Sequence, residues 1–487
     1  MIRLMAAVIV SLVTCIPVAA DYLPNQAVSW ADFSCVNDIA SSGSYVYFAT
    51  TAGIIRYDKI RDRWEEPLTG AAGLHDDNIA RVWVDVFDRR LLAETSTGLF
   101  EYDRLLQTWY PVDELPSLEN DDRHLQPEPD MHPPFGFNYG VDGRLIDQYN
   151  RPYTVIDVVD DQAGRLWLAV WGLGAAQANS TTQMVELMPY GLLQNHVTTM
   201  LIHDGLLWVA GPSYGSRRSG ITVYDIEDNS FQYYESGLTT DFPAVDINCL
   251  QVDDSTVYVG TMNGLLCLDR ESGRVTRHLP RRSGLNDSEV YSIALSGDSV
   301  YVGTADGLNL IVGNDDTVRY VRPGQLGYQP IHDLQRFGSS LWIAAASGAY
   351  RFLPGSRTLK KLRDPHQVLF GDVYDIELID SNLWFLADDG VMQLDARTGE
   401  TEPFRLPVYG PAPRCLAVND TIAVVASDKG MTIVFYKNTT VFTRDFTVED
   451  GLASNVVYSL LLDGDFIWIG TDRGLTRFHW NNPDRVD

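Results

Sequence analysis

The sequence predicts an all-β fold, a β-propeller of repeated four-stranded blades, and three observations support this prediction. A turn glycine recurs at intervals of about 40–45 residues, with one longer gap. The segments between the glycines are short, rich in β-branched residues and bounded by turns, without the 3.6-residue period of a helix. Several units carry an aromatic residue, a glycine and a threonine in the same order, as propeller blades often do. The recurring turn glycines are Gly53, Gly98, Gly174, Gly220, Gly264, Gly307, Gly348, Gly390, Gly430 and Gly474.

The last unit displays the expected elements of one blade in order. They are a turn (451–455), an apolar strand (456–462), a tight turn (463–465), a second strand (467–471), a second turn (472–474) and a third strand (475–478). The phrases VYVGTADGLNLI from Val300 and VYVGTMNGLLCLD from Val257 repeat its second and third strands. Other units continue into a fourth strand, for example at 317–320. The glycine of each phrase suits a short turn between twisted strands, because such turns often need a positive φ.

Ten such units follow one another, and the last one lacks an outer strand. The segment Ala27–Phe33, just before the first unit, is the candidate that supplies this strand. Pairing the two ends of the chain closes a ring and removes exposed sheet edges. We therefore expect residues 21–487 to form one large ring, with two smaller propellers as the alternative.

The longer gap between turn glycines holds an insertion at residues 113–153, between units two and three. Its first part is acidic and rich in proline, and its second part predicts a hairpin around Val141–Gly143. A second irregular loop, Gly211–Gly220, interrupts unit four. Long loops on rigid scaffolds tend to carry function, so we expect both to contribute to one ligand surface. The candidate ligand-binding residues are Phe135, Tyr139, Trp171, Tyr214, Arg217 and Arg218.

The roles expected for these residues follow from their chemistry. The two arginines would anchor an anionic group, and the aromatic residues would stack or pack against the ligand. In contrast, the Trp or Tyr at the second-strand position of each unit, such as Trp468, has apolar neighbours and is expected to pack between blades.

The sequence holds no His-Glu-x-x-His, Cys-x-x-Cys or phosphate-loop motif. We therefore assign no catalytic residue, metal ligand or cofactor. A propeller can still assemble an active site from distant loops, so a hydrolase or lyase stays open as an alternative.

Four cysteines follow the first 20 residues: Cys35, Cys249, Cys267 and Cys415. Cys249 and Cys415 lie nine residues before the second-strand aromatic position, four units apart, where other units hold Ser or Asp. Because a ring separates equivalent positions in distant blades by more than the ~7 Å that a disulfide allows, we expect four free thiols.

Residues 1–20 predict a signal peptide, with a basic start, an apolar run and Val18-Ala19-Ala20 before the cleavage point. Anchoring as a lipoprotein at Cys15 is the alternative. No later stretch is apolar for the ~20 residues of a spanning helix. The 487 residues carry a net charge of −28, which disfavours nucleic acid and anionic membranes as partners. A periplasmic or extracellular location is expected.

The phrase Gly451–Phe478 resembles the two-component regulator propeller repeat, and Gly284–Leu310 matches the same pattern with Tyr301 in the tryptophan place. The resemblance implies a propeller of the kind found in periplasmic sensor regions and in secreted envelope proteins. It favours an exported, non-enzymatic propeller that binds a protein or glycan ligand. A scaffold subunit of an envelope or secretion complex is a further alternative. The chain has no kinase or membrane helix of a sensor, so signalling would need a separate partner.

Overall fold

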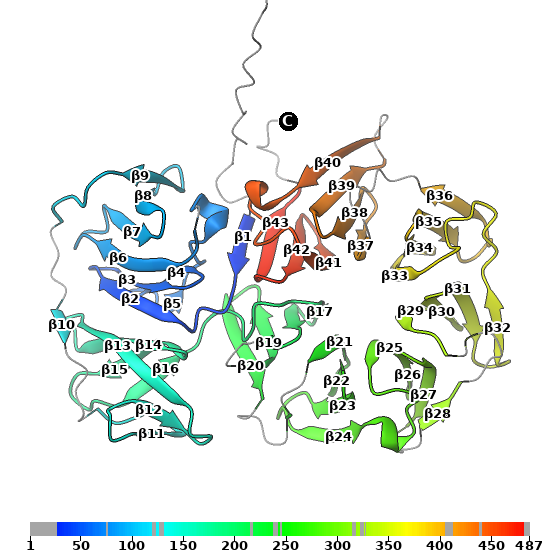
Figure 1. The fold of residues 1–487 in the computed structure, drawn as a ribbon, viewed down its shortest axis with the longest axis horizontal. Helices are drawn as coiled ribbons and strands as arrows, with labels where there is room; N and C mark the ends of the chain where they lie inside the picture. The colour runs from blue at the N-terminus through cyan, green and yellow to red at the C-terminus, as the bar shows by residue number, and fades with distance from the viewer. Residues whose placement is uncertain are drawn as a thin grey trace, which may run out of the picture.

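The protein is all-β in a computed structural model, and its described residues form 43 strands in ten sheets and three short 3-10 helices (Figure 1). The structure describes residues 27–74, 76–118, 123–125, 131–214, 218–236, 242–243, 246–313, 318–321, 326, 328–404, 413–437 and 441–481. Within these residues no helix is long and apolar enough to cross a membrane. Each sequence unit forms one blade, and we number the blades one to ten in chain order. The blade prediction is therefore confirmed.

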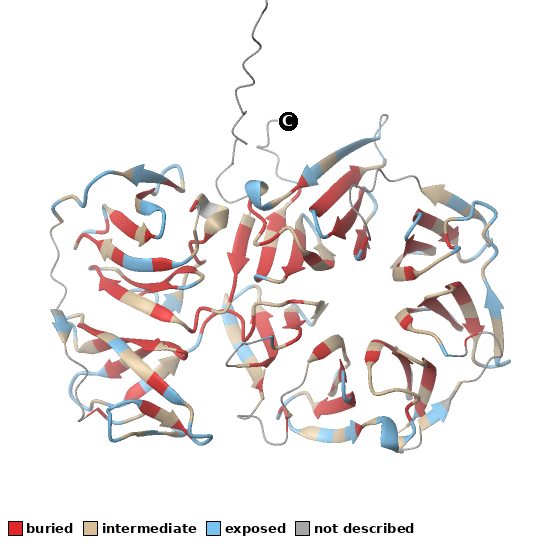
Figure 2. Cartoon of the chain, viewed as in Figure 1, coloured by how far each residue is buried: buried red, intermediate tan, exposed pale blue. Residues whose placement is uncertain are grey.

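Blades four to ten form a ring around a common axis, with the first strand of each blade innermost (Figure 1). Blade four consists of β17 (Thr199–His203), β18 (Leu206–Ala210), β19 (Gly220–Asp225) and β20 (Ser230–Glu235), and blade five of β21 (Ile247–Val252), β22 (Thr256–Thr261), β23 (Gly264–Asp269) and β24 (Val275–Leu279); blade six consists of β25 (Val290–Ser296), β26 (Ser299–Thr304), β27 (Gly307–Val312) and β28 (Val318–Tyr320). Blade seven consists of β29 (Ile331–Phe337), β30 (Ser340–Ala345), β31 (Gly348–Leu353) and β32 (Thr358–Lys361), and blade eight of β33 (Val373–Ile379), β34 (Asn382–Ala387), β35 (Gly390–Asp395) and β36 (Thr401–Phe404). Blade nine consists of β37 (Cys415–Val418), β38 (Ile422–Ser427), β39 (Gly430–Phe435) and β40 (Phe442–Phe446), and blade ten of β41 (Val457–Asp463), β42 (Phe466–Thr471) and β43 (Leu475–His479). Outer strands such as β32 and β40 carry exposed residues, whereas the strands inside them are largely buried (Figure 2).

The N-terminal strand β1 (Ala27–Trp30) completes blade ten. It pairs antiparallel with β43, from Ala27 opposite Phe478 to Trp30 opposite Leu475. The predicted pairing of the two chain ends is thus confirmed, although the strand stops at Trp30. The ring itself closes between blades ten and four, where the Ser459 hydroxyl donates to the Val197 carbonyl at 3.5 Å.

Blades one to three lie outside this ring, so the expected single ring of ten blades is wrong. Their strands are, for blade one, β2 (Val36–Ser41), β3 (Tyr45–Thr50), β4 (Gly53–Asp58) and β5 (Arg63–Trp64); for blade two, β6 (Ile79–Val84), β7 (Leu91–Thr95), β8 (Gly98–Asp103) and β9 (Thr108–Val112); and for blade three, β13 (Pro152–Asp160), β14 (Arg165–Trp171), β15 (Gly174–Asn179) and β16 (Val185–Met188). β2 contacts both β6 and β13, so blade one is the middle of a three-blade arc beside the ring (Figure 1). The 3-10 helices η1 (Gly70–Ala72), η2 (Arg281–Ser283) and η3 (Val448–Asp450) lie between blades. The ring closes after seven blades because blade four packs against blade ten rather than against blade three.

In blades five, six and ten, a buried glycine in the second strand lets the next blade approach closely. A Cβ on Gly303 would lie 2.7 Å from the Ile331 side chain of the next blade, and one on Gly470 would lie 2.6 Å from Val197. Blade two carries the charged Glu94 at this position, and the contacts of its inner strand β6 with other blades are with β2 and β3 of blade one among the described strands. Its free face bears polar pairs instead, with Arg90 and Glu101 in a hydrogen-bonded ion pair.

The insertion covers the other end of the arc. Its strands are β10 (Arg123–Leu125), β11 (Phe137–Tyr139) and β12 (Leu145–Asp147), and they extend the sheet of blade three through β13. Met131 and Leu145 are buried against Val158 and Leu168, on the face of blade three that points away from blade one. The insertion thus buries apolar surface that a neighbouring blade would otherwise cover.

The threonine of the repeated phrase closes the turn between the second and third strands. In blade ten the Thr471 hydroxyl donates to the Gly474 carbonyl at 2.9 Å and accepts from the Arg473 N–H. Gly474 has a φ of 142°, which a residue with a side chain rarely adopts.

In other blades, the first-strand position that Cys249 and Cys415 occupy holds a side chain that hydrogen-bonds to the next blade. We call it the blade-linking position. The Asp333 carboxylate accepts from Ile376 N–H of the next blade, and the Asp375 carboxylate accepts from Leu416 N–H. Cys249 and Cys415 are free thiols there, as are Cys35 and Cys267.

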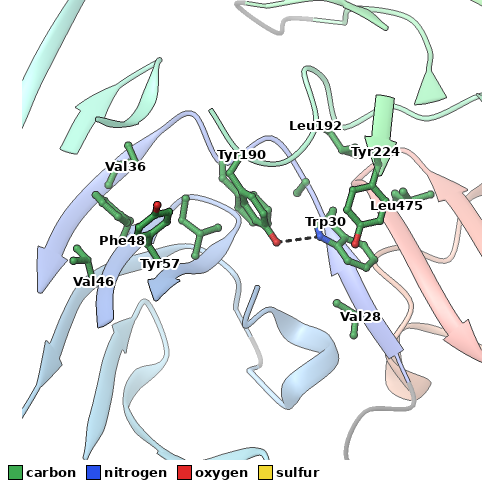
Figure 3. Packing of buried hydrophobic residues seen from close by; sticks show 14 of the residues in the cluster. Val28, Trp30, Val36, Val46, Phe48, Tyr57, Tyr190, Leu192, Tyr224 and Leu475 are labelled. Atoms are coloured by element: carbon green, nitrogen blue, oxygen red, sulfur yellow. Dashed lines mark hydrogen bonds between the residues drawn. The ribbon is translucent and has the colours of Figure 1, made fainter. Parts of the chain in front are cut away.

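Arc and ring share one hydrophobic core. Trp30 of β1 is fully buried, and its indole N–H donates to the Tyr190 hydroxyl at 3.3 Å (Figure 3). The Tyr190 ring packs on Trp64 of blade one, with 4.8 Å between centroids, and Trp30 packs on Tyr224 of blade four. The same cluster contains Trp167 and Trp468, which confirms that the second-strand tryptophans are packing residues.

Candidate functional site

One face of the ring carries a belt of polar and aromatic side chains around the axis, with one residue from each blade, and all of these side chains are half-exposed except the exposed Arg414. Those of blades five to ten immediately precede the blade-linking position of the innermost strand, so they lie at the same end of equivalent strands. Blade four contributes a histidine from the segment before β17. These seven residues, which we call the axial belt, are His196, Asn248, Tyr291, His332, Tyr374, Arg414 and Tyr458.

Neighbouring members of the belt touch across blade boundaries. The His332 ring lies between Tyr291 and Tyr374, with centroid distances of 6.5 and 5.8 Å. The Arg414 guanidinium lies 4.7 Å from the centre of the Tyr458 ring. Tyr458 in turn contacts His196 at 4.5 Å. The belt therefore contains two runs of touching side chains, one from blades six to eight and one from blades nine, ten and four.

Carboxylates accompany the belt residues. The Tyr291 hydroxyl donates to Glu289 and the Tyr374 hydroxyl donates to Asp388, both at 2.6 Å. Burial, together with the hydrogen bond to the carboxylate, raises the pKa of Tyr291 to about 12 and raises that of Tyr374 as well. Both tyrosines therefore stay neutral at physiological pH, one on each side of the His332 ring.

The two belt histidines are also neutral. Burial lowers the pKa of His332, and the Asp372 carboxylate, 3.8 Å from its Nε2, opposes this effect only in part. Burial likewise lowers the pKa of His196, against the charge of Asp472. In the part of the chain that the structure describes, no group of three His, Cys, Asp or Glu side chains is placed to hold a metal ion.

Three more carboxylates belong to the inner strands next to the belt. Asp333 of blade seven and Asp375 and Glu377 of blade eight are close enough to influence one another. Burial raises the pKa of each, and mutual repulsion raises the pKa of Asp333 and Glu377 further. An added positive charge at the axis would therefore favour their ionised forms.

Of the residues predicted to bind a ligand, Tyr214 reaches the belt. Its ring lies 5.1 Å from that of His196 and is 73% exposed. Arg217 lies outside the described residues. Arg218 is buried in an ion pair with Glu235 at 2.7 Å and also lies over the Tyr233 ring, so its guanidinium already has a carboxylate partner.

The other predicted residues lie on blade three and its insertion. Phe135 is fully exposed, Tyr139 belongs to β11 and packs against the core of blade three, and Trp171 ends β14 half-buried. The structure therefore does not bring these three together with Tyr214. Within the insertion, Arg151 lies near enough to Glu235 of β20 for that charge to contribute to its raised pKa.

A signal for the belt is present in the sequence. Aligning the units on their second-strand aromatic residue identifies the blade-linking position, and the belt residues of blades five to ten directly precede it. Tyr, His, Asn and Arg at that place differ from the apolar residues around them. Their meeting at one axis depends on ring closure, which the alignment does not contain.

Comparisons with known proteins bear on the fold. No protein-family description matches the sequence, and a comparison with curated proteins finds no match. The solved structure of PorZ, a bacterial surface component of the type-IX secretion system of Porphyromonas gingivalis, is similar with a TM-score of 0.58 at 14% identity, covering 93% of this chain and 87% of that one. The extracellular domain of the hybrid two-component system BT4673 of B. thetaiotaomicron gives a TM-score of 0.50 at 14% identity, covering 93% and 71%. The chain therefore has a fold of the two-component regulator propeller type.

Proposed function

We propose that the protein is an exported, non-enzymatic propeller that binds a protein or glycan ligand at the axial belt. The observation that carries the proposal is the belt itself. Every blade of the ring contributes a polar or aromatic side chain to one half-exposed surface, although the inner strands otherwise carry mainly apolar and blade-linking residues. A rigid scaffold with several convergent polar groups and ring faces is typical of a binding site.

Ring faces suit this role because they offer large contact areas at low conformational cost. Tyr374 and His332 are fixed by their neighbours on both sides, so little side-chain freedom is lost on binding. The exposed Tyr214 ring extends the same surface outward from His196.

Export rests on the expected signal peptide, residues 1–20, which lies outside the described residues. The descriptions of PorZ as a surface component and of the BT4673 domain as extracellular support the same location. PorZ also gives some support to the alternative of a scaffold subunit in a secretion complex.

The proposal is tested by affinity capture from the native envelope, with glycan-array binding in parallel. The bait is the wild-type chain or a Tyr374→Ala/His332→Ala variant, and Tyr110→Ala, at an exposed site of the arc, is the control. We expect the belt variant to lose the captured ligand and the control to retain it. If all three baits capture the ligand equally well, the ligand binds outside the axial belt.

A hydrolase or lyase is the second candidate, and one observation favours it. His332 is a neutral imidazole beside the Asp372 carboxylate, a pair that suits a general base. Turnover of a captured ligand by the wild type and its loss in His332→Ala would identify an enzyme, whereas binding without turnover would support the first proposal.

A further inference from the structure

We propose that the ligand of the axial belt is a polypeptide segment with lysine or arginine side chains, and that one of these cationic side chains points toward the inner-strand carboxylates. This inference rests on the proposed function and narrows it to one class of partner. Four features of the ring face support it.

The first feature is a set of carboxylates around the belt. They come from the connections before the inner strands or from the turns between second and third strands, and each lies next to a belt residue: Asp246, Glu289, Asp372, Asp388 and Asp472. A carboxylate offers about four acceptor positions. Glu289 and Asp388 each accept from one tyrosine hydroxyl, so acceptor capacity remains for a further donor. The buried Oδ1 of Asp472 has no hydrogen-bond partner among the described residues.

The second feature is the set of ring faces between these carboxylates. A lysine ammonium or an arginine guanidinium is attracted to the face of an aromatic ring within about 6 Å. The belt already contains this contact, because Arg414 lies over Tyr458. Tyr291 and Tyr374 offer the same chemistry, each with a carboxylate at its hydroxyl end.

The third feature is the group of inner-strand carboxylates. Asp333 and Asp375 each use one oxygen to hold the next blade, and Glu377 makes no hydrogen bond to the described residues. Burial and mutual repulsion disfavour their ionised forms, as their raised pKa values indicate. A cationic side chain that approaches along the axis would relieve this repulsion, whereas a neutral or anionic group would not.

The fourth feature is the scarcity of competing cations. Within the described part of the belt, Arg414 is the one positively charged member, and both histidines are neutral. Lys429 and Arg473 lie in turns of the same face, and each directly follows an aspartate. With a chain charge of −28, the long-range field also favours the approach of a basic segment.

The test measures binding of the full chain to short synthetic peptides that contain lysine and arginine. The matched probes are the same peptides with acetylated lysine and with citrulline in place of arginine. We expect the basic peptides to bind, the uncharged peptides to bind at least tenfold more weakly, and the affinity to fall at least tenfold between ~50 and ~500 mM salt.

The carboxylates are tested with a Glu289→Gln/Asp388→Asn variant, which keeps an acceptor oxygen for each tyrosine hydroxyl. A matched control, Asp113→Asn/Glu114→Gln, makes the same change of charge at exposed positions of the insertion. We expect the belt variant to bind the basic peptides at least tenfold more weakly and the control to bind them as the wild type does. Unchanged unfolding temperatures confirm that both variants are folded.

Three results would overturn this inference. They are equal binding of the basic and uncharged peptides, binding that the belt substitutions leave unchanged, and no binding of any peptide. If a glycan is bound instead, and its binding depends on Tyr374 but not on salt, the ligand class is wrong while the belt remains the binding site. Only capture that is insensitive to Tyr374 and His332 contradicts the proposed function itself.

Discussion

At the scale of single residues, the burial of Asp77 makes the stability of this fold depend on pH. It lies in the connection between blades one and two, beside a pocket of about 350 Å³ that residues of the arc and the ring line together. Its carboxylate accepts a hydrogen bond from the Gly70 N–H. Burial raises the pKa of Asp77 to about 6, with a further rise from Asp76 and an opposing effect from Arg473.

The sign of the pH effect follows from this shift. The folded chain holds the Asp77 proton more tightly than the unfolded chain, whose pKa is near 3.8. The free energy of unfolding therefore falls as pH rises from about 4 to about 6, and it stays lower above that range. The rise of the Asp77 pKa from 3.8 to about 6 corresponds to at most ~3 kcal/mol.

We predict that Asp77→Asn removes this fall in the free energy of unfolding as pH rises. The amide oxygen still accepts from the Gly70 N–H, and no charge forms above pH 6. The variant should unfold at a higher temperature than the wild type at pH 8 and at nearly the same temperature at pH 4. Melting curves over this pH range check the prediction, and a difference that does not change with pH would contradict it.

At the scale of elements, β1 is the strand that joins the chain ends. Ser29 lies opposite Thr476 in the register, and their hydroxyls are 2.8 Å apart. Directly opposed residues of an antiparallel pair have Cα atoms about 4.5–5.5 Å apart, which is within the range for a disulfide.

We predict that Ser29→Cys/Thr476→Cys forms a disulfide under oxidising conditions and raises the unfolding temperature. The bridge would close a very long loop and restrict the unfolded chain. Faster migration on a non-reducing gel and loss of two titratable thiols relative to the reduced variant are the measurements. The Ser29→Cys single variant is the control. If both new thiols stay free, β1 does not pair with β43 in this register.

At the scale of the whole molecule, the shared core makes arc and ring one cooperative unit. Tyr190 lies in the connection from blade three to blade four and packs on Trp64 of the arc and Phe231 of the ring. Its hydroxyl also donates to the Glu65 carbonyl. Arg477 of blade ten adds an ion pair to Glu66 at the same joint.

We predict one calorimetric unfolding transition for the wild type and two for Tyr190→Ala. The substitution leaves a cavity and unpaired polar groups at the joint, which costs about 3–5 kcal/mol and uncouples the arc. Tyr436→Ala is the matched control, because Tyr436 packs on Trp384 and Phe404 within the ring. The control should lower the temperature of a single transition. Two transitions in the wild type would show that the shared core does not couple the two parts.

The blade and its closing strand could be predicted from the sequence because short-range interactions encode them. The Thr471–Gly474 turn, the alternation of buried side chains and the missing outer strand all lie within one unit or at a chain end. The arrangement of ten blades as seven plus three could not be predicted in this way. Most blades have two packing faces, and the neighbour of each face is chosen by long-range packing.

Glu94 and the insertion illustrate this difference. In the sequence, Glu94 is a departure from the glycine of the repeated phrase, and residues 113–153 are an irregular loop. In the structure, both belong to the ends of the arc, where no further blade packs.

For the candidate site, too, one part could be predicted from the sequence and the other could not. The sequence by itself determines that a polar or aromatic residue precedes the blade-linking position in unit after unit, because each repeat keeps the same local register. The tertiary structure alone decides that six such residues, together with His196 of blade four, surround one axis, since Val197 of blade four must pack against Ser459 of blade ten to close the ring. That contact joins residues 262 positions apart, and hydrophobic burial between whole blades, rather than any local pattern, determines it.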